Sequence, residues 1–295
     1  MLVSFYRLTG GIWTKYDVIA KPKSVIWDKR FYSVGSFQIR TDRAPCELYD
    51  IVTYGDNSGI VLRIKQNYEY TEIYGYDLKG IAKFRQYPGQ TLTSDTNAET
   101  LMRGWVQNYL MTGDKAVEGL TLSAAHGYEP KIPQGEIEKG TLSDVLEEQG
   151  KNCAIGWDIK FDFIQKNMSF DFILSNNNPT AVFSREHKNI ESAERIRDAY
   201  DEVNSLTGIR LREGDTENPA SDYITAEANG HIHPGTDYSL GDIVTVKEFG
   251  ESGQLQVTEL KYVYETNKIL VIPTFGEAKD NIIKKIVKEV QKQNG

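Results

Sequence analysis

The sequence has few of the residues from which disulfide frameworks, metal sites and active sites are usually built. Its 295 residues include two cysteines, Cys46 and Cys153, which stand far apart and lack metal-type spacing. Two lone thiols indicate a reducing compartment rather than a secreted disulfide scaffold. No Gly-x-Ser-x-Gly or His-Glu-x-x-His motif of a hydrolase occurs. These absences predict a protein that is not an enzyme.

Histidine is scarce as well, and one pair alone has a spacing that suits a metal. Two of the four histidines stand alone, whereas His231 and His233 form a His-x-His pair. In a strand, both imidazoles would point to one side and could hold a metal with a third ligand such as Asp237 or Asp242. Two ligands do not make a site, and the Pro-Gly step that follows favours a loop. The pair is therefore a metal candidate only, and we expect no cofactor.

Long apolar runs are also missing. No run approaches the roughly 20 residues that a membrane-spanning helix needs. The N-terminus lacks the basic start, apolar stretch and small-residue cleavage site of a signal peptide. We therefore expect the chain to be made and folded in the cytoplasm, and to leave the cell only as part of a particle.

Charge is distributed unevenly along the chain. The formal net charge is -8 at pH 7. Residues 1–90 carry 13 Lys and Arg against 9 Asp and Glu, which gives +4, and the remainder carries 21 against 33, which gives -12. Binding to nucleic acid needs a concentrated basic face that releases counterions from phosphates. This distribution instead favours a surface that DNA passes without sticking.

Aromatic and β-branched residues are plentiful, and in the first third of the chain they form short strands. Hydrophobic residues make up 39% of a sequence with 17 tyrosines, so the chain can bury a core. Residues 1–92 contain short apolar runs separated by turn residues such as Gly10-Gly11. This spacing predicts a small β-barrel or sandwich. The runs cover residues 18–19, 24–27, 35–40, 51–54, 59–66 and 68–75.

Residues 93–178 change to a helical period. An amphipathic helix is predicted to begin at a Thr96–Glu99 capping box, because apolar residues then recur every three or four positions. A second, shorter helix is predicted over residues 141–150. Residues 155–174 alternate apolar and polar side chains on both sides of a polar turn, which predicts a hairpin. Together these elements predict an α+β module inserted between two β parts.

The last third of the chain returns to β character and ends in a helical pattern. Strands are expected over residues 202–211, 243–246, 255–264 and 269–273, and a polar loop over residues 213–223. Residues 278–293 have one apolar stripe, which predicts an amphipathic helix. The expected fold class is α+β, predominantly β. Its parts are a first tube-like β-barrel (1–92), the inserted α+β module (93–178), a second β-barrel (179–276) and a C-terminal amphipathic helix (277–295).

Five motifs occur in an order that resembles the phage tail hub family. The first reads as strand, corner, strand, because Val25, Trp27, Phe37 and Ile39 share one face and a Val-Gly-Ser step supplies the bend. The motifs are Trp27–Ile39, Tyr74–Arg85, Phe183–Glu186, Asn189–Ile190 and Tyr238–Val246. The family comprises baseplate-hub and tail-associated proteins that close the distal end of a tail tube, in siphophages and related injection particles.

The resemblance implies a structural role at the tail tip of a virion or phage-tail-like particle. Two barrels per subunit in a homotrimer would make a pseudo-hexameric ring that closes the tail tube. The tail tube or a distal tail protein would lie on one side, and a tip spike or fibre protein on the other. DNA would pass through without specific binding, and membrane contact would come only through the particle. Two alternatives stay open: a cell-wall endopeptidase and a carbohydrate-binding tail-tip protein.

The expected C-terminal helix is the predicted coupling element. Its apolar stripe must be covered, because each aliphatic side chain left exposed costs about 1.5–3 kcal/mol. The cover is its own domain, the same helix in neighbouring subunits, or another protein, and the resemblance favours the last two. The stripe consists of Ile282, Ile283, Ile286, Val287 and Val290.

Overall fold

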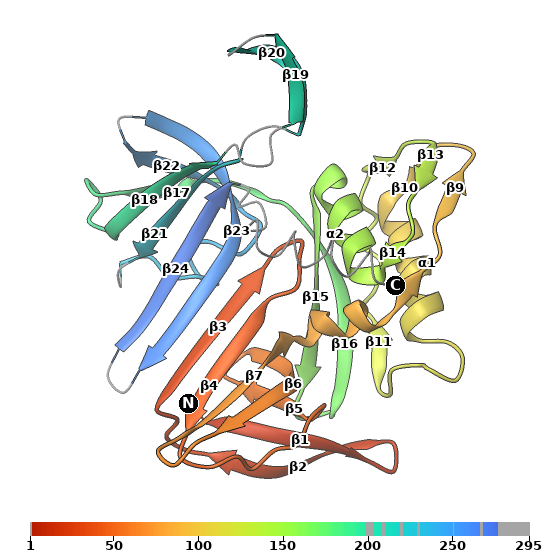
Figure 1. Ribbon diagram of the computed structural model, residues 1–295, viewed down its shortest axis with the longest axis vertical. Coiled ribbons are helices and arrows are strands. Elements are labelled where there is room, and N and C mark those ends of the chain that lie inside the picture. The colour runs from red at the N-terminus through yellow and green to blue at the C-terminus, as the bar shows by residue number, and fades with distance from the viewer. Residues whose placement is uncertain are drawn as a thin grey trace.

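The computed structural model describes residues 2–198, 203–207, 210–218, 221–228, 231–249, 251–265 and 268–276. Strands dominate this part of the chain, which confirms the expectation of a predominantly β fold. In Figure 1 a long sheet runs from the upper left to the bottom, and the two main helices lie in a separate layer on the right. The expected helix over residues 278–293 lies outside the described residues.

The largest described sheet has 13 strands and includes strands from both ends of the chain. Its path is β18-β21-β24-β23-β3-β4-β7-β6-β5-β1-β2, and β22 pairs with both β23 and β17. The strands before the helices are β1 (Val3–Thr9), β2 (Ile12–Ile19), β3 (Ser24–Arg30), β4 (Ser36–Thr41), β5 (Ile51–Tyr54), β6 (Asn57–Gln66) and β7 (Thr71–Asp77). Those after them are β17 (Asn177–Ser184), β18 (Ile190–Asp198), β21 (Ser221–Ala228), β22 (Ile243–Glu248), β23 (Glu251–Glu265) and β24 (Lys268–Gly276).

The first-half strands bury one face in an aromatic core, as period-two spacing requires. Val25, Trp27, Phe37 and Ile39 are all buried, which confirms that they share one face. The rings of Trp27 and Phe37 stack with their centroids 4.7 Å apart. A second core lies in the other half, where Phe183 contacts Tyr238 and Phe275 at centroid distances of 4.9 and 4.7 Å. Each half of the large sheet therefore has its own apolar centre.

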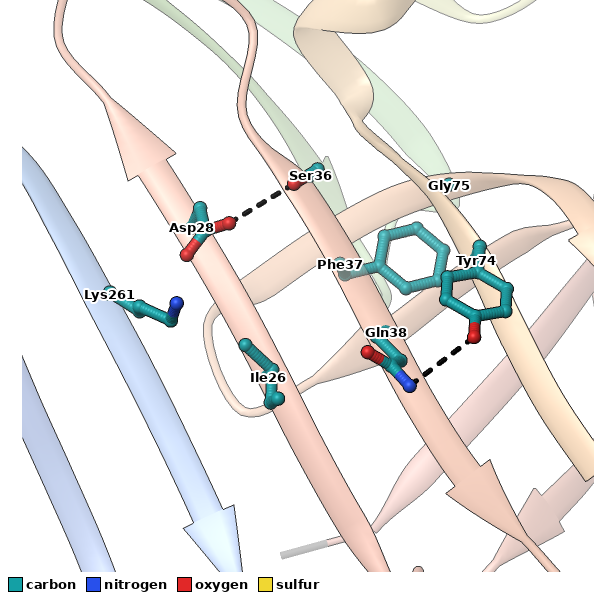
Figure 2. A pocket seen from close by; sticks show the side chains of 8 residues that line it. All are labelled: Ile26, Asp28, Ser36, Phe37, Gln38, Tyr74, Gly75 and Lys261. Carbon is teal, nitrogen blue, oxygen red and sulfur yellow. Dashed lines mark hydrogen bonds between the residues drawn. The ribbon is translucent and has the colours of Figure 1, made fainter. Parts of the chain in front are cut away.

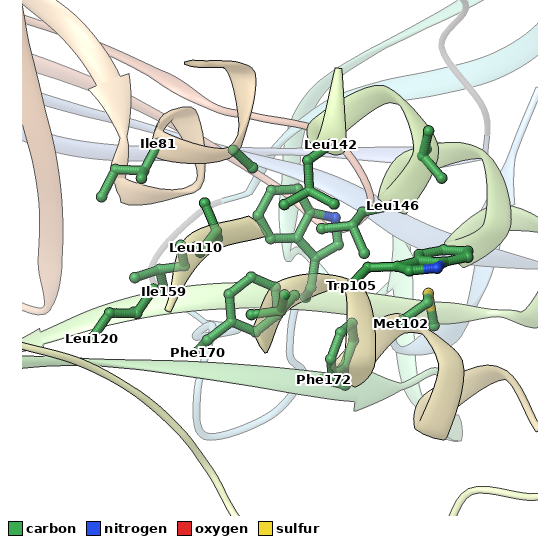
Figure 3. Packing of buried hydrophobic residues seen from close by; sticks show 14 of the residues in the cluster. Ile81, Met102, Trp105, Leu110, Leu120, Leu142, Leu146, Ile159, Phe170 and Phe172 are labelled. Carbon is green, nitrogen blue, oxygen red and sulfur yellow. The ribbon is translucent and has the colours of Figure 1, made fainter. Parts of the chain in front are cut away.

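The α+β module lies between these halves in the sequence. Two helices pack on a sheet in which β11 and β15 flank β16, and Figure 3 shows the side chains that fill the space between them. Met102 and Trp105 are buried there, as are Phe170 and Phe172. The predicted hairpin over residues 155–174 is confirmed. The elements are α1 (Ala98–Leu110), β11 (Leu120–Leu122), α2 (Leu142–Cys153), β15 (Ile155–Asp162) and β16 (Asn167–Leu174).

Short strands connect this core to its surroundings. A 3-10 helix, η1, leads from β7 into the module, and three two-stranded ladders follow between residues 86 and 141. A further hairpin, formed by β19 and β20, stands outside the large sheet. The elements are η1 (Leu78–Phe84), β8 (Gln86–Tyr87), β9 (Gln90–Leu92), β10 (Thr96–Asn97), β12 (Lys131–Ile132), β13 (Gly135–Ile137), β14 (Gly140–Thr141), β19 (Val203–Thr207) and β20 (Arg210–Asn218).

Three local predictions are wrong, the first being the single strand expected over residues 202–211, which the structure divides between the antiparallel strands β19 and β20. The N-cap of α1 is Asn97 rather than Thr96, since the Asn97 side chain accepts a hydrogen bond from the Thr100 amide at 2.9 Å. Glu99 instead turns inward and accepts three backbone N–H groups of residues 126–128. The loop expected over residues 213–223 is largely strand, because β20 and β21 cover most of it. The polar composition and Pro219 favoured a loop there, whereas strand pairing is made by backbone groups that every residue other than proline carries.

Candidate functional site

The two β-rich halves meet edge to edge where β3 pairs with β23. On one side of this joint, Tyr262 lies opposite Trp27 and Tyr264 lies opposite Val25. The Tyr264 ring also contacts Tyr54 edge to face, with the centroids 4.8 Å apart. This side of the joint is therefore continuous with the aromatic core of the first half.

The other side of the joint carries opposite charges. Arg30 lies opposite Glu259, and Asp28 lies opposite Lys261. The Arg30 Nε and Glu259 Oε2 atoms are 3.1 Å apart. Opposite charges at directly facing positions stabilise a strand pair. We call the polar side of β23, β3, β4 and β7 the joint face.

The joint face continues across β4 and β7 in a network around Glu72. Its carboxylate is 2.8 Å from Arg40 Nη2, accepts the Tyr74 hydroxyl at 2.9 Å and lies 3.7 Å from Lys65 Nζ. The hydrogen bond from Arg40 lowers the pKa of Glu72, and the same bond raises the pKa of Arg40. The Arg40 guanidinium also lies over the Tyr70 ring, 4.4 Å from its centre. A phosphate that approached Arg40 would have to compete with a carboxylate that already holds it.

Figure 2 shows a shallow groove on the joint face, with a volume of about 340 Å³. Asp28 and Lys261, one from each half, line one side of it. Ser36 Oγ donates to Asp28 Oδ2 at 3.1 Å, and Gln38 Nε2 donates to the Tyr74 hydroxyl at 3.4 Å. The remaining lining residues are Ile26, Phe37 and Gly75. One carboxylate without a partner acid, and no histidine or cysteine, do not make an acyl-transfer or glycosidase centre.

All three parts of the described chain meet around Phe31, in the turn between β3 and β4. Its ring is buried, and it fills the space above Gly156 of the module and Gly241 of the second half. The Phe31 amide donates to the Thr258 carbonyl at 3.0 Å, and its carbonyl accepts from the Trp157 amide at 3.3 Å. The turn therefore fixes the module against both halves at once.

Tyr32 extends the same junction. Its hydroxyl donates to Gln256 Oε1 at 2.9 Å, and its carbonyl accepts from the Trp157 indole at 2.6 Å. Trp157 belongs to β15 and Gln256 belongs to β23. One residue of the first half thus bonds to the module and to the second half.

A buried ammonium completes the junction. Lys79 is 1% exposed, and its Nζ donates to the carbonyls of Arg30 and Phe31 at 2.8 and 3.1 Å. The same atom lies 4.4 Å from the centre of the Trp157 ring. Burial lowers the pKa of Lys79 to about 8, although the carboxylate of Asp77 opposes this shift.

Asp77 is the buried carboxyl beside this ammonium. Its Oδ2 accepts the Gly35 amide at 3.0 Å, which ties β7 to the turn between β3 and β4. Burial raises the pKa of Asp77 to about 6, while Lys79 acts in the opposite direction. Sequence reasoning placed both residues in a motif but gave them no role. A lysine set among Leu78, Gly80 and Ile81 is the signal that could have found the site.

The metal candidates lie elsewhere. His231 and His233 flank the buried Ile232 in a turn, and both are exposed. The His233 amide donates to Asp237 Oδ2 at 2.7 Å, and Asp242 likewise accepts a backbone N–H. In the ranges that the structure describes, no group of three or more His, Cys, Asp and Glu side chains could hold a metal ion. Metal binding by the pair stays a prediction.

No helix among the described residues is both long enough and apolar enough to cross a membrane.

Family comparison identifies the kind of protein to which these features belong. Residues 8–218 match the model of the Siphovirus ReqiPepy6 Gp37-like protein family. The chain belongs to this family. The match covers most of the first half, the whole module and the strands up to β20. The resemblance to phage tail proteins is thereby confirmed. A search of curated proteins found no match.

Solved structures of tail proteins share the fold. The prophage tail protein gp18 from Listeria monocytogenes EGD-e is 10% identical, with a TM-score of 0.58, and the alignment covers 99% of each chain. The tail protein from Neisseria meningitidis MC58 is 14% identical, with a TM-score of 0.56 over 93% of this chain and 96% of that one. The 43 kDa tail protein of prophage MuSo2 from Shewanella oneidensis is 10% identical, with a TM-score of 0.53 over 93% and 97%.

Proposed function

We propose that this siphovirus tail protein is a structural hub of the tail tip. Three copies form a pseudo-hexameric ring that closes the tail tube and connects it to the tip spike or fibres. The observation that carries the proposal is the joint between β3 and β23, which unites two β-rich halves in one sheet. Each chain then supplies two adjacent wall segments, and three chains supply six. Six similar segments match a six-fold tube, whereas three chains match a three-fold tip.

The separate cores of the two halves support the division into a first barrel (1–92), an inserted module (93–178) and a second barrel (179–276). The module core holds the helices and the first-half core holds Trp27, while Phe275 belongs to a third. We propose that both halves are small tube-like barrels. The inserted module then projects from the wall of the proposed ring. It is the part of the chain that a simple tube protein would lack.

The joint face is the proposed lining of the bore. Its arginines are matched by carboxylates, as Arg30 is by Glu259 and Arg40 by Glu72. Paired cations attract phosphates less than free ones, so DNA passes without being held. The role is structural and not enzymatic, in keeping with the family and the groove's lining.

The proposed neighbours are the tail tube or a distal tail protein on one side and a spike or fibre protein on the other. The protein assembles in the host cytoplasm and works in the virion tail. The coupling role of Ile282, Ile283, Ile286, Val287 and Val290, outside the described residues, belongs to this proposal. Deleting residues 278–295 should leave a folded protein that fails to recruit the next tip protein, as measured by particle assembly. Complete particles from the truncated chain would contradict the coupling role.

The mass of the purified protein in solution tests whether three chains form the proposed ring. Light scattering of the purified protein should give the mass of three chains, and negative-stain images should show rings with a central hole. A protein that stays monomeric at every concentration, or one that forms open filaments, would contradict the proposal.

A further inference from the structure

Several large apolar side chains are exposed on the first two strands and on a neighbouring loop. They lie just before β1, on β1 and β2, and in the loop between β4 and β5, and Figure 1 shows β1 and β2 at the bottom of the molecule. Scattered exposed apolar residues are normal, but a group on neighbouring elements marks an interaction surface. The group consists of Leu2, Leu8, Ile12, Tyr16, Leu48 and Tyr49.

The loop in this group is held in a fixed shape. Asp50, which is 4% exposed, accepts Arg7 Nε and Nη2 at 3.0 and 2.9 Å and the Tyr16 hydroxyl at 2.5 Å. The Glu47 amide donates to the same carboxylate at 2.7 Å. These bonds connect the loop to β1 and β2. The loop therefore presents its outer residues without losing conformational freedom on binding.

Those outer residues are Leu48 and Tyr49, which are 49% and 65% exposed. Tyr49 has a φ of +72°, in the left-handed region that bulky residues rarely adopt. Its amide donates to the Val61 carbonyl at 2.7 Å, and this bond holds the conformation. Backbone strain at an exposed aromatic residue is a reason to look for a function of that residue. Rigid tyrosines are typical anchors of protein interfaces.

The same side carries an open strand edge. Among the described strands, β2 pairs only with β1, and at the far end of the sheet path β18 pairs only with β21. An open edge readily pairs with another strand. Because the two edges differ and lie at opposite ends of one sheet, they suit a head-to-tail contact between copies, which closes into a ring or continues as a filament.

Charge favours the same pairing. The first 90 residues carry a net charge of +4, and residues 179–276, which contain the second half, carry 9 Lys and Arg against 17 Asp and Glu, which gives -8. On the edge strands themselves the charges are mixed, since β2 carries Lys15 and Asp17, and β18 carries Glu191, Glu194 and Asp198 beside Arg195 and Arg197, so the preference comes from the halves as a whole. Complementary charge steers the first half of one copy toward the second half of another.

We propose that the β2 edge of one copy, with Leu48 and Tyr49 as its anchor, receives the β18 edge of the next copy. This inference rests on the proposed ring and specifies its subunit contact. The occupant is a second copy of this chain, since the two open edges belong to parts of opposite net charge, +4 for residues 1–90 and -8 for residues 179–276.

The anchor is tested by Tyr49→Gly. Glycine suits the left-handed backbone, so the variant should unfold at the same temperature as the wild type or a higher one. Loss of the aromatic ring should raise the dissociation constant between copies about tenfold or more. The matched control is Tyr68→Gly, which removes a fully exposed tyrosine from the turn between β6 and β7 and should leave association unchanged.

Light scattering over a concentration series measures the association of both variants. It also distinguishes failure of this interface from failure of the proposed ring. A trimeric wild type whose association is unaffected by Tyr49→Gly overturns this interface and leaves the ring standing. A wild type that stays monomeric overturns the ring, and this contact with it.

The head-to-tail direction needs a separate experiment. Copies with Lys15→Cys are mixed with copies carrying Glu194→Cys and treated with a short thiol-specific cross-linker. The native Cys46 and Cys153 are buried, so the wild type serves as the background control. Linked chains should appear in the mixture and not with either variant alone. Links formed within the Lys15→Cys variant alone would show a symmetric contact and overturn the proposal.

Discussion

The junction around Phe31 is packed so closely that it leaves no room for one added carbon atom. A Cβ at position 156 would lie 2.5–2.7 Å from atoms of the Phe31 ring, which is buried and has nowhere to move. We expect Gly156→Ala to lower the free energy of unfolding by about 1–3 kcal/mol. Urea denaturation measures the change, and Gly253→Ala, whose new Cβ meets nothing within 4 Å, is the control. Equal stability of the two variants would contradict the packing described for Phe31.

The buried carboxyl of Asp77 makes stability depend on pH. Its pKa is raised to about 6 in the folded protein, from 3.8. The folded state therefore holds a proton that the unfolded state has released, and this contribution is present below pH 3.8 and lost as pH rises through about 6.

Asp77→Asn removes this titration while the side-chain oxygen can still accept the Gly35 amide. Between about pH 4 and pH 7, the free energy of unfolding of the wild type should fall relative to the variant by on the order of 2–3 kcal/mol. Urea titrations of both proteins at several pH values give the difference. Parallel curves across this range would show that Asp77 titrates normally.

At the scale of the elements, variants at the start of helix α1 test which residue is its N-cap. Asn97→Ala should lower the free energy of unfolding by about 1 kcal/mol, because the Thr100 amide loses its acceptor. Thr96→Ala should have little effect, since the Thr96 hydroxyl donates to the Ser94 carbonyl and caps nothing. Thermal unfolding of the two variants compares them directly. A larger loss of stability for Thr96→Ala than for Asn97→Ala would show that Thr96 is the N-cap, as the capping box predicts.

The local sequence pattern was sufficient to predict some elements of the fold and insufficient to predict others. The hairpin of β15 and β16 follows from strict alternation around Trp157 and Phe170, and the start of α2 follows from Thr141, whose hydroxyl accepts the Asp144 amide. Thr96 and Asn97 are both good caps, so the sequence could not choose between them. The polar residues 213–223 lack the alternation that reveals a strand.

The joint between the halves could not be predicted from local pattern. Its strands are far apart in the sequence, so no short-range period records their pairing. What the sequence does contain is complementary charge, as Arg30 faces Glu259 and Asp28 faces Lys261. These pairs become informative only after the register is known. The role of Phe31 was hidden for the same reason, because Gly156 and Gly241 approach it from two distant segments.

For the whole molecule, the proposed bore predicts a gain of DNA binding when its carboxylates are neutralised. The wild type should bind DNA weakly at physiological salt. The double variant Glu72→Gln, Glu259→Gln removes the carboxylates that face Arg40 and Arg30, and should bind DNA more tightly with a steeper salt dependence. Fluorescence anisotropy with a labelled duplex measures both.

A charge-matched control separates the position of the charge from its amount. Glu148 and Glu186 are exposed and lie away from the joint face. The double variant Glu148→Gln, Glu186→Gln changes the net charge equally and should not gain affinity. Equal gains for both double variants would show that overall charge, and not the joint face, controls DNA binding.

The joint also determines when the protein can be completed during synthesis. The hydrogen bond between Tyr32 and Gln256 spans 224 positions, and β3 meets its partner β23 only after nearly the whole chain has been made. Contacts this distant slow folding, because a long loop must close before they form. Until then, the edge of β3 is open and Tyr262 and Tyr264 are missing from the first core. A chain interrupted before β23 therefore cannot complete this sheet, so the joint between the halves forms only in chains that have been synthesised past β23.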